Sequence, residues 1–399
     1  MGGTSGTLAI DGGTPVRTAF LPYAHQQISD ADVEAVVAAL RSDWLTTGPR
    51  VPEFEEGLAA ATGARHAIAF SSGTAALHGA AVAAGLGPGD EAITTPMTFA
   101  ATANCVLYAG AEVRFADIDP GTLLVRPDLV EAALTERTKA ILPVDYSGQP
   151  ADYRAIRAIA DRAPGGRPLI IADASHSLGA TRDGETVGRM ADMSILSLHP
   201  AKILTTGEGG AVLTDDEALA GRLRRFRNHG ISSELRARRD WTYAMVELGY
   251  NYRLTDIGAA LGTSQLARLD EFLAIRRGLA ARYQERLGGH ELLDMPVVEP
   301  GTDPAWHFSF ARLRLDRLRV DRGAVFHAMR AEGIGVNVHY IPVHHHPYYR
   351  ERYPGLSFPV AEAAYERLLT LPLHAGMTGA DVDDVVAALD KVTTAYRAG

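Results

Sequence analysis

Helix-like and strand-like segments alternate from about residue 55 to about residue 215, and this alternation constrains the fold more than any other feature of the chain. The strand-like segments are short and apolar, and they cover residues 66–70, 91–95, 112–116, 140–144 and 168–172. Such alternation predicts an α/β fold with a mostly parallel central sheet and helices on both of its faces. Ligands bind these sheets at the carboxyl ends of the strands, so functional residues are expected there.

The length of 399 residues is too great for one small core and predicts a large domain followed by a smaller one. We expect a flexible leader at residues 1–20, a large domain at 21–275 and a small α+β domain at 276–399. A helical pattern over roughly residues 255–286 is expected to lead from the large domain into the small one.

The composition argues against several classes of protein. Hydrophobic residues make up 46% of the chain and charged residues 22%, as is typical of a soluble globular protein. The net charge of −9 argues against nucleic-acid binding, and no apolar run approaches the roughly 20 residues that span a membrane. Residues 1–6 lack the basic and apolar regions of a signal peptide, and Cys105 has no second cysteine to pair with. We therefore expect a cytoplasmic protein.

Lys202 lies in a glycine-rich loop between two strand-like segments at residues 192–197 and 209–214. A lysine that is held in this way and shielded from water has a lowered pKa, because desolvation disfavours the ammonium form. The neutral amine can then form a Schiff base with an aldehyde cofactor. The alternative is a solvated lysine in a surface turn, since lysines are rarely buried.

Three further features follow other strand-like segments. Residues 71–77 form a short polar turn that opens a helix, where Gly73 and Thr74 suit a phosphate; an ordinary helix cap is the alternative. Asp173 follows the segment 168–172, where a carboxylate can keep a pyridine nitrogen protonated or can cap a helix. Phe99 can stack on a flat ring or pack in a core. Together with Lys202, these residues indicate pyridoxal phosphate (PLP) as the cofactor.

The motifs also resemble a known family. Their positions along the chain are residues 44–49, 72–77, 117–119, 144–149, 173–176, 197–210 and 249–256. In type, order and spacing they are similar to the sugar aminotransferases of the DegT/DnrJ/StrS type, within the fold type I PLP enzymes. The resemblance runs from residue 21 to about residue 389. It implies that the chain is a PLP-dependent transaminase.

The resemblance also implies roles for individual residues. Lys202 would bond to the cofactor and move protons, Asp173 would pair with the pyridine nitrogen, and His176 would lie close to the ring. Phe99 would stack on the ring. Gly73, Thr74 and Ser197 would hold the phosphate, together with Asn251 from a neighbouring subunit, so a homodimer with a shared active site is expected. The residues that would line the sugar-nucleotide pocket are Tyr23, Trp44, Leu45, Thr46, His339 and Tyr340.

Within the family, the sequence is most similar to enzymes that aminate C4 of a UDP-linked 4-keto-6-deoxy sugar, as in pseudaminic-acid biosynthesis. Glutamate is the expected amino donor, with glutamine as the alternative. The segment 8–17 instead resembles family members that act on keto-cyclitols in antibiotic pathways, and Ala172 stands where many relatives have Glu. The remaining alternatives are a sugar dehydratase, in which histidine would replace Lys202, and a cofactor-binding regulator without catalytic activity.

Three consecutive histidines at residues 344–346 raise the question of a metal site. Three consecutive residues of a regular element cannot all face one ion. We therefore expect a pocket or surface loop here, and no metal.

Overall fold

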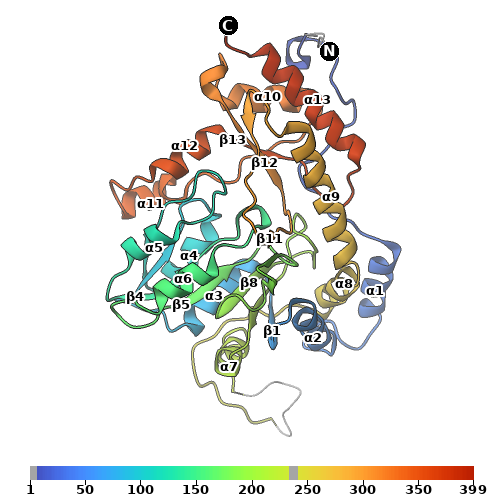
Figure 1. Cartoon of the computed structure of the whole chain (residues 1–399). Coiled ribbons are helices and arrows are strands. Elements are labelled where there is room, and N and C mark those ends of the chain that lie inside the picture. The colour runs from blue at the N-terminus through green and yellow to red at the C-terminus, as the bar shows by residue number, and fades with distance from the viewer. Residues whose placement is uncertain (1–6, 233–240) are drawn as a thin grey trace.

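The computed structural model describes residues 7–232 and 241–399. Within them, a seven-stranded sheet has the strand order β1-β9-β8-β5-β4-β2-β3 (Figure 1). The strands are β1 (His66–Phe70), β2 (Glu91–Thr94), β3 (Glu112–Phe115), β4 (Thr138–Leu142), β5 (Leu169–Asp173), β8 (Met193–Ser197) and β9 (Gly210–Thr214). The pairs from β3 to β8 are parallel, whereas β9 runs antiparallel to both β1 and β8. The prediction of a mostly parallel sheet is confirmed.

Helices cover both faces of this sheet, as predicted. One face packs against α3 (Gly73–Ala83), α4 (Ala100–Tyr108) and α7 (Glu217–Phe226). The other packs against α2 (Arg50–Thr62), α5 (Pro127–Ala133), α6 (Tyr153–Ala160) and α8 (Asp256–Leu266). Ile170 belongs to one core and Ile171 to the other, because successive side chains of a strand point to opposite faces. Burial of both faces explains why most side chains of these strands are apolar, with exceptions such as Arg114 in β3 and Lys139 in β4.

The expected long helix at residues 255–286 is two helices, α8 and α9 (Leu269–Leu287), so that prediction was wrong. The break falls at Ala267 and Arg268, and Arg268 has φ −109° and ψ 11°. Side chains at the break bind the first turn of α1 (Asp30–Leu40): Gln265 donates to Asp32 at 2.7 Å, and Arg268 lies 3.7 Å from the same carboxylate. The spacing of apolar residues in the sequence could not reveal this tertiary contact.

A smaller three-stranded antiparallel sheet follows α9 in the chain. Its strands are β10 (Leu293–Asp294), β12 (Ser309–Leu313) and β13 (Leu368–Leu371). The helices of this part are α10 (Arg322–Ala331), α11 (Pro347–Arg352), α12 (Pro359–Arg367) and α13 (Gly379–Ala395). The predicted domain boundary at residue 275 falls inside α9, which runs beside the large sheet at one end and packs against α13 at the other (Figure 1).

The leader was expected to be flexible, but over residues 7–20 it packs against the C-terminal part of the chain. Leu8 is buried in the core of the smaller sheet. The buried carboxylate of Glu332 accepts hydrogen bonds from the backbone N–H groups of Ala9 and Val16, at 2.9 and 3.0 Å. Arg17 pairs with Asp381 at 2.7 Å. A buried carboxylate needs such donors, which gives the physical reason why residues 9–16 lie against it.

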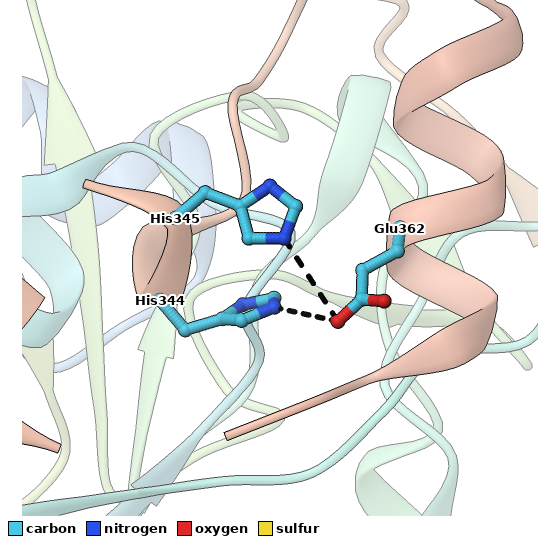
Figure 2. A group of neighbouring side chains, drawn as sticks. All are labelled: His344, His345 and Glu362. Atoms are coloured by element: carbon cyan, nitrogen blue, oxygen red, sulfur yellow. Dashed lines mark hydrogen bonds and ion pairs between the residues drawn. The ribbon is translucent and has the colours of Figure 1, made fainter. Parts of the chain in front are cut away.

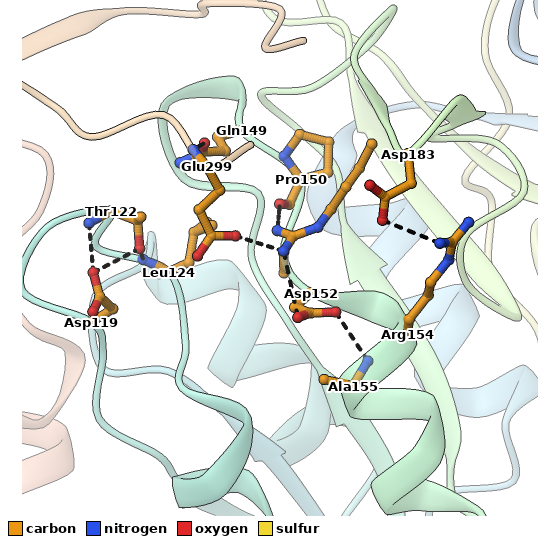
Figure 3. A network of polar contacts seen from close by, with 12 residues as sticks. Asp119, Thr122, Leu124, Gln149, Pro150, Asp152, Arg154, Ala155, Asp183 and Glu299 are labelled. Carbon is orange, nitrogen blue, oxygen red and sulfur yellow. Dashed lines mark hydrogen bonds and ion pairs between the residues drawn. The ribbon is translucent and has the colours of Figure 1, made fainter. Parts of the chain in front are cut away.

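A third sheet of short strands lies beside the large one. It consists of β6 (Thr181–Arg182), β7 (Glu185–Thr186) and β11 (Thr302–Asp303). Arg182 binds Glu299 at 2.6 Å, Asp152 at 3.4 Å and the carbonyl oxygen of Pro150 at 3.0 Å. Figure 3 shows these three partners together, with Asp152 also capping α6 through Ala155. Arg182 therefore links Glu299, which precedes β11, to Pro150 and Asp152, which follow the motif at residues 144–149.

None of the helices within residues 7–232 and 241–399 is long and apolar enough to cross a bilayer.

Candidate active site

A pocket of about 390 Å³ opens where β5 and β8 end, between the large sheet and the C-terminal part of the chain. Most of the predicted site residues line it: Tyr23, Gly73, Thr74, Phe99, Asp173, His176, Ser197, Lys202, His339 and Tyr340. These residues come from distant parts of the sequence. The fold therefore brings the predicted cofactor residues other than Asn251 together in one pocket.

One end of the pocket is formed by the N-terminus of α3. Ser72 caps this helix, and its hydroxyl accepts a hydrogen bond from the Ala75 N–H at 3.1 Å. The first N–H groups of a helix have no partner within the helix and can bind a phosphate. Two glycines allow the backbone to come close here. A Cβ at Gly73 would lie 3.0 Å from Ser197 Cβ, and one at Gly210 would lie 2.5 Å from the Ser72 carbonyl oxygen. The two interpretations of residues 71–77, a helix cap and a phosphate site, are therefore compatible: Ser72 caps α3, and the first N–H groups of the helix remain available to a phosphate.

Asp173 is buried at the end of β5 and points into the pocket. Its carboxylate accepts hydrogen bonds from the Thr102 hydroxyl at 2.6 Å and from the Ser175 N–H at 3.2 Å. Thr102 is in turn bonded to Thr98, with 2.7 Å between the two hydroxyl oxygens. Sequence reasoning missed Thr102, although it follows Phe99 by three residues, which is the spacing of neighbours on one helix face.

Lys202 lies half-buried in the pocket wall. Its loop is held at several points: Lys202 N–H donates to His199 O, and Leu198 N–H donates to Gly209 O, both at 2.9 Å. Burial lowers the pKa of Lys202 to about 8, against the opposing effect of the Asp173 charge. The structure therefore favours the nucleophilic interpretation of Lys202 over that of a solvated turn lysine.

Histidine and tyrosine side chains form the wall opposite the phosphate end. His176 Nε2 lies 3.0 Å from the Tyr340 hydroxyl, and its ring lies 4.6 Å from that of His307. Burial holds the pKa of both His176 and His307 well below the usual value, and the Lys202 charge adds to this effect. Burial also lowers the pKa of His339 to about 3. The imidazoles beside Lys202 are therefore neutral at physiological pH.

His307 was not predicted. It belongs to the segment 306–313, which reads as an ordinary strand, and no sequence signal distinguishes it from a core residue. The His176 Nδ1 atom is buried and has no hydrogen-bond partner among the described residues. An additional polar group in the pocket could satisfy it.

The remaining predicted residues lie elsewhere on the described part of the chain. Trp44, Leu45 and Thr46 are exposed, outside the pocket lining, and this segment is attached to α8. The Asp256 N–H donates to Leu45 O at 3.0 Å. Asn251 is also exposed and forms a β-bridge with Asn228. Phe99 lines the pocket but is 60% exposed, with its ring 6.0 Å from that of Tyr340.

The pocket combines a helix N-terminus, a buried carboxylate and a lysine of lowered pKa at the carboxyl edge of a mostly parallel sheet. These features define a fold type I PLP-dependent enzyme. The chain belongs to the DegT/DnrJ/EryC1/StrS aminotransferase family, whose model matches residues 26–390.

Individual relatives agree with this assignment. The spore coat polysaccharide biosynthesis protein SpsC of Bacillus subtilis is 40% identical over 380 residues, which cover 94% of this chain and 97% of SpsC. Helicobacter pylori PseC, an aminotransferase involved in the biosynthesis of pseudoaminic acid, superposes with a TM-score of 0.88 at 28% identity. The match covers 94% of this chain and 100% of PseC.

The protein Spr1654 of Streptococcus pneumoniae has been solved in a PLP form and in a PMP form. The PLP form superposes with a TM-score of 0.87 at 29% identity, covering 94% of this chain and 99% of that protein. The present chain is a PLP-dependent sugar aminotransferase.

The residues present fit this cofactor. The glycines at positions 73 and 210 let the start of α3 pack directly against β8 and β9, where its first N–H groups face the pocket. Lys202 offers an amine of lowered pKa, and Asp173 offers a carboxylate that is already fixed by two donors. Together they would supply a phosphate site, a nucleophile and a partner for a protonated ring nitrogen.

Proposed function

We propose that the enzyme transfers an amino group from glutamate to the C4 ketone of a UDP-linked 4-keto-6-deoxy sugar. The observation that carries the reaction type is the lowered pKa of Lys202 beside the buried Asp173 carboxylate. The substrate class is supported by the similarity to PseC and SpsC over nearly the whole chain. Glutamate as the donor and a cytoplasmic location belong to the same proposal and rest on the sequence.

PLP, when bound, supplies a conjugated ring that stores the electron pair of the broken bond. The protein's part would begin with Lys202, whose neutral Nζ would hold the aldehyde and would afterwards take up and return a proton. The Asp173 carboxylate would keep the ring nitrogen protonated, and Thr102 and Ser175 hold that carboxylate in place. Gly73, Thr74 and Ser197 are proposed to hold the phosphate.

The other wall of the pocket is proposed to bind and shield the reacting groups. Phe99 and His176 would enclose the ring, and Tyr23, His339 and Tyr340 would contact the sugar. The Tyr340 hydroxyl is fixed by His176 at 3.0 Å, and His339 Nδ1 lies 2.9 Å from the Thr370 hydroxyl. Side chains held in this way can orient a substrate without rearranging, which lowers the entropic cost of the reaction.

We propose further that two copies of the chain share each active site. Large apolar side chains are exposed along the segment before Asn251, namely Trp241, Met245, Val246, Leu248 and Tyr250. Trp44 and Leu45 are exposed as well. Contiguous exposed apolar surface marks an interface with another protein. In a two-fold dimer, Asn251 and the 44–46 segment would complete the partner's pocket.

Mixed dimers test this sharing. Lys202→Ala and Asn251→Ala are each expected to be nearly inactive. In a mixed dimer, one site carries both changes and the other carries neither, so random exchange of subunits should restore about a quarter of the wild-type activity. Lys202→Ala mixed with Asp173→Asn provides the control: both changes affect the same chain's pocket, so no activity should return. An active Asn251→Ala enzyme, or mixtures as inactive as their parents, would contradict the proposal.

The substrate is tested by steady-state kinetics with glutamate and a panel of ketones. UDP-linked 4-keto-6-deoxy sugars should give kcat/KM values well above those of keto-cyclitols. The competing candidate, a keto-cyclitol, is supported only by the sequence of residues 8–17, and these pack around Glu332 rather than along the pocket. A clear preference for a cyclitol would overturn the proposed substrate while leaving the transaminase chemistry intact.

A further inference from the structure

Three potential metal ligands converge away from the active-site pocket. His344 and His345 belong to the short helix η5 (Val343–His345), and Glu362 belongs to α12. His344 Nε2 lies 2.9 Å and His345 Nε2 lies 3.9 Å from the same oxygen, Glu362 Oε1. Figure 2 shows both imidazole rings directed toward this carboxylate. The donor atoms of all three residues lie within 4.8 Å of one another.

This spacing suits a single ion. Zinc binds imidazole nitrogen and carboxylate oxygen at about 2.0–2.2 Å. Atoms separated by 2.9, 3.9 and at most 4.8 Å can all reach one ion at this distance if they shift by a few tenths of an ångström. Two histidines and one glutamate form a common zinc ligand set that leaves a fourth position open.

The surroundings favour a cation and allow it to enter. The His344 side chain is 2% exposed, whereas those of His345 and Glu362 are 26% and 31% exposed, so one side of the cluster faces solvent. The Phe358 N–H donates to Glu362 Oε1 at 2.8 Å and orients the carboxylate. Asp117 accepts hydrogen bonds from the first turn of α12 and adds a second negative charge nearby.

We propose that His344, His345 and Glu362 bind a divalent transition-metal ion of the Zn²⁺ class, which joins η5 to α12. The sequence predicted no metal because three consecutive histidines cannot face one ion. The structure instead directs two of them to one point and adds a ligand from a distant helix. His339 and Tyr340 lie only a few residues before η5, so the ion would also steady one wall of the pocket. This inference does not depend on the proposed substrate.

The test is equilibrium dialysis of the PLP-loaded enzyme against Zn²⁺, with metal and protein measured in each chamber. The wild-type enzyme should bind one Zn²⁺ per chain more tightly than His345→Gln or Glu362→Gln by at least about tenfold. His346→Gln is the matched control, because it removes the neighbouring histidine, which lies outside the cluster, and should bind like the wild type. Zinc bound by the cofactor or by the pocket histidines should be the same in the wild type and the three variants. It therefore does not affect the difference in zinc binding between them.

Thermal unfolding supplies a second readout and reports whether each variant is folded. Zn²⁺ should raise the Tm of the wild type and of His346→Gln, because an ion that binds only the folded state stabilises it. It should raise the Tm of His345→Gln less. Equal zinc affinity in the wild type and His345→Gln would overturn the proposal and reduce the cluster to a hydrogen bond between His344 and Glu362. A loss in His346→Gln as large as that in His345→Gln would overturn it as well.

Discussion

Arg276 donates a hydrogen bond from Nη2 to the backbone carbonyl oxygen of Lys202 at 3.3 Å. Its Nη1 donates to the carbonyl oxygens of Trp306, His307 and Leu373, at 3.2, 3.0 and 3.1 Å. The residue is 2% exposed, and burial lowers its pKa to about 10. One buried guanidinium therefore connects the lysine loop of the large sheet to two segments of the C-terminal part.

Replacing Arg276 with Met should displace the lysine loop. The change leaves four carbonyl groups without this donor, at a cost of about 1–3 kcal/mol for each buried group that finds no substitute. We expect kcat to fall at least about tenfold, with a smaller change in KM, because Lys202 is displaced when its loop loses the hydrogen bond from Arg276. Arg276→Lys should recover only part of the rate, since an ammonium cannot reproduce the planar fork of donors.

Arg277→Met is the matched control, because the Arg277 guanidinium binds Pro304, Gly179 and Asp303 and makes no contact with the lysine loop. Steady-state kinetics, together with Tm values to confirm folding, would distinguish the two. Equal kcat values in Arg276→Met and the wild type would show that the loop does not need this anchor.

The pKa of Lys202 predicts how the apoenzyme takes up its cofactor. Because the pKa is lowered to about 8, the reactive neutral amine should increase about tenfold per pH unit below pH 8 and level off above it. The rate of PLP capture, followed by absorbance, should show the same dependence. In Asp173→Asn the favourable charge is lost while burial remains, so the midpoint should move to lower pH. A midpoint near that of a solvated lysine would contradict the assignment.

The lowered pKa of His339 should make the free energy of unfolding decrease at acidic pH. Its pKa is about 3 in the folded protein against 6.5 for the unperturbed group, so below pH 6.5 the unfolded state binds the extra proton. Stability is therefore lost as the pH falls through this range, by about 2 kcal/mol between pH 7 and pH 5. Chemical unfolding of His339→Gln should show a correspondingly smaller loss between these two pH values. His327→Gln, which alters an exposed histidine of α10, should lose as much stability as the wild type.

A side chain at position 210 should disturb the proposed phosphate site by steric clash. A Cβ at this position would lie 2.5 Å from the Ser72 carbonyl oxygen and 2.6 Å from the Gly73 nitrogen. In Gly210→Ala the start of α3 must move, at a cost of about 1–3 kcal/mol. Cofactor affinity, measured by titrating the apoenzyme with PLP, should fall roughly tenfold or more. Gly278→Ala is the control, since its Cβ meets nothing within 4 Å and should leave PLP affinity unchanged.

The sequence predicted the parts of the site that depend on local pattern. A strand recognisable from its apolar sequence precedes each of Lys202, Asp173 and the turn at Gly73. Parallel strands bring their carboxyl ends to one edge of the sheet. His307 and Arg276 were missed because their roles arise only when α9 and the C-terminal sheet dock on the large sheet. The same applies to Glu332, whose buried carboxylate binds Ala9 and Val16 in a segment that was expected to be flexible from its composition.

The most direct test of the account is the reaction of the PLP-loaded enzyme with glutamate alone, followed by the absorbance change of the cofactor in a single turnover. The wild type should convert its cofactor from the aldehyde to the amine form. Lys202→Ala should bind PLP and remain folded but convert it slower by at least about a thousandfold, since it lacks both the nucleophile and the proton carrier. Lys139→Ala, which removes an exposed lysine, should react like the wild type. A Lys202→Ala enzyme that converts its cofactor at the wild-type rate would show that Lys202 is not the catalytic lysine.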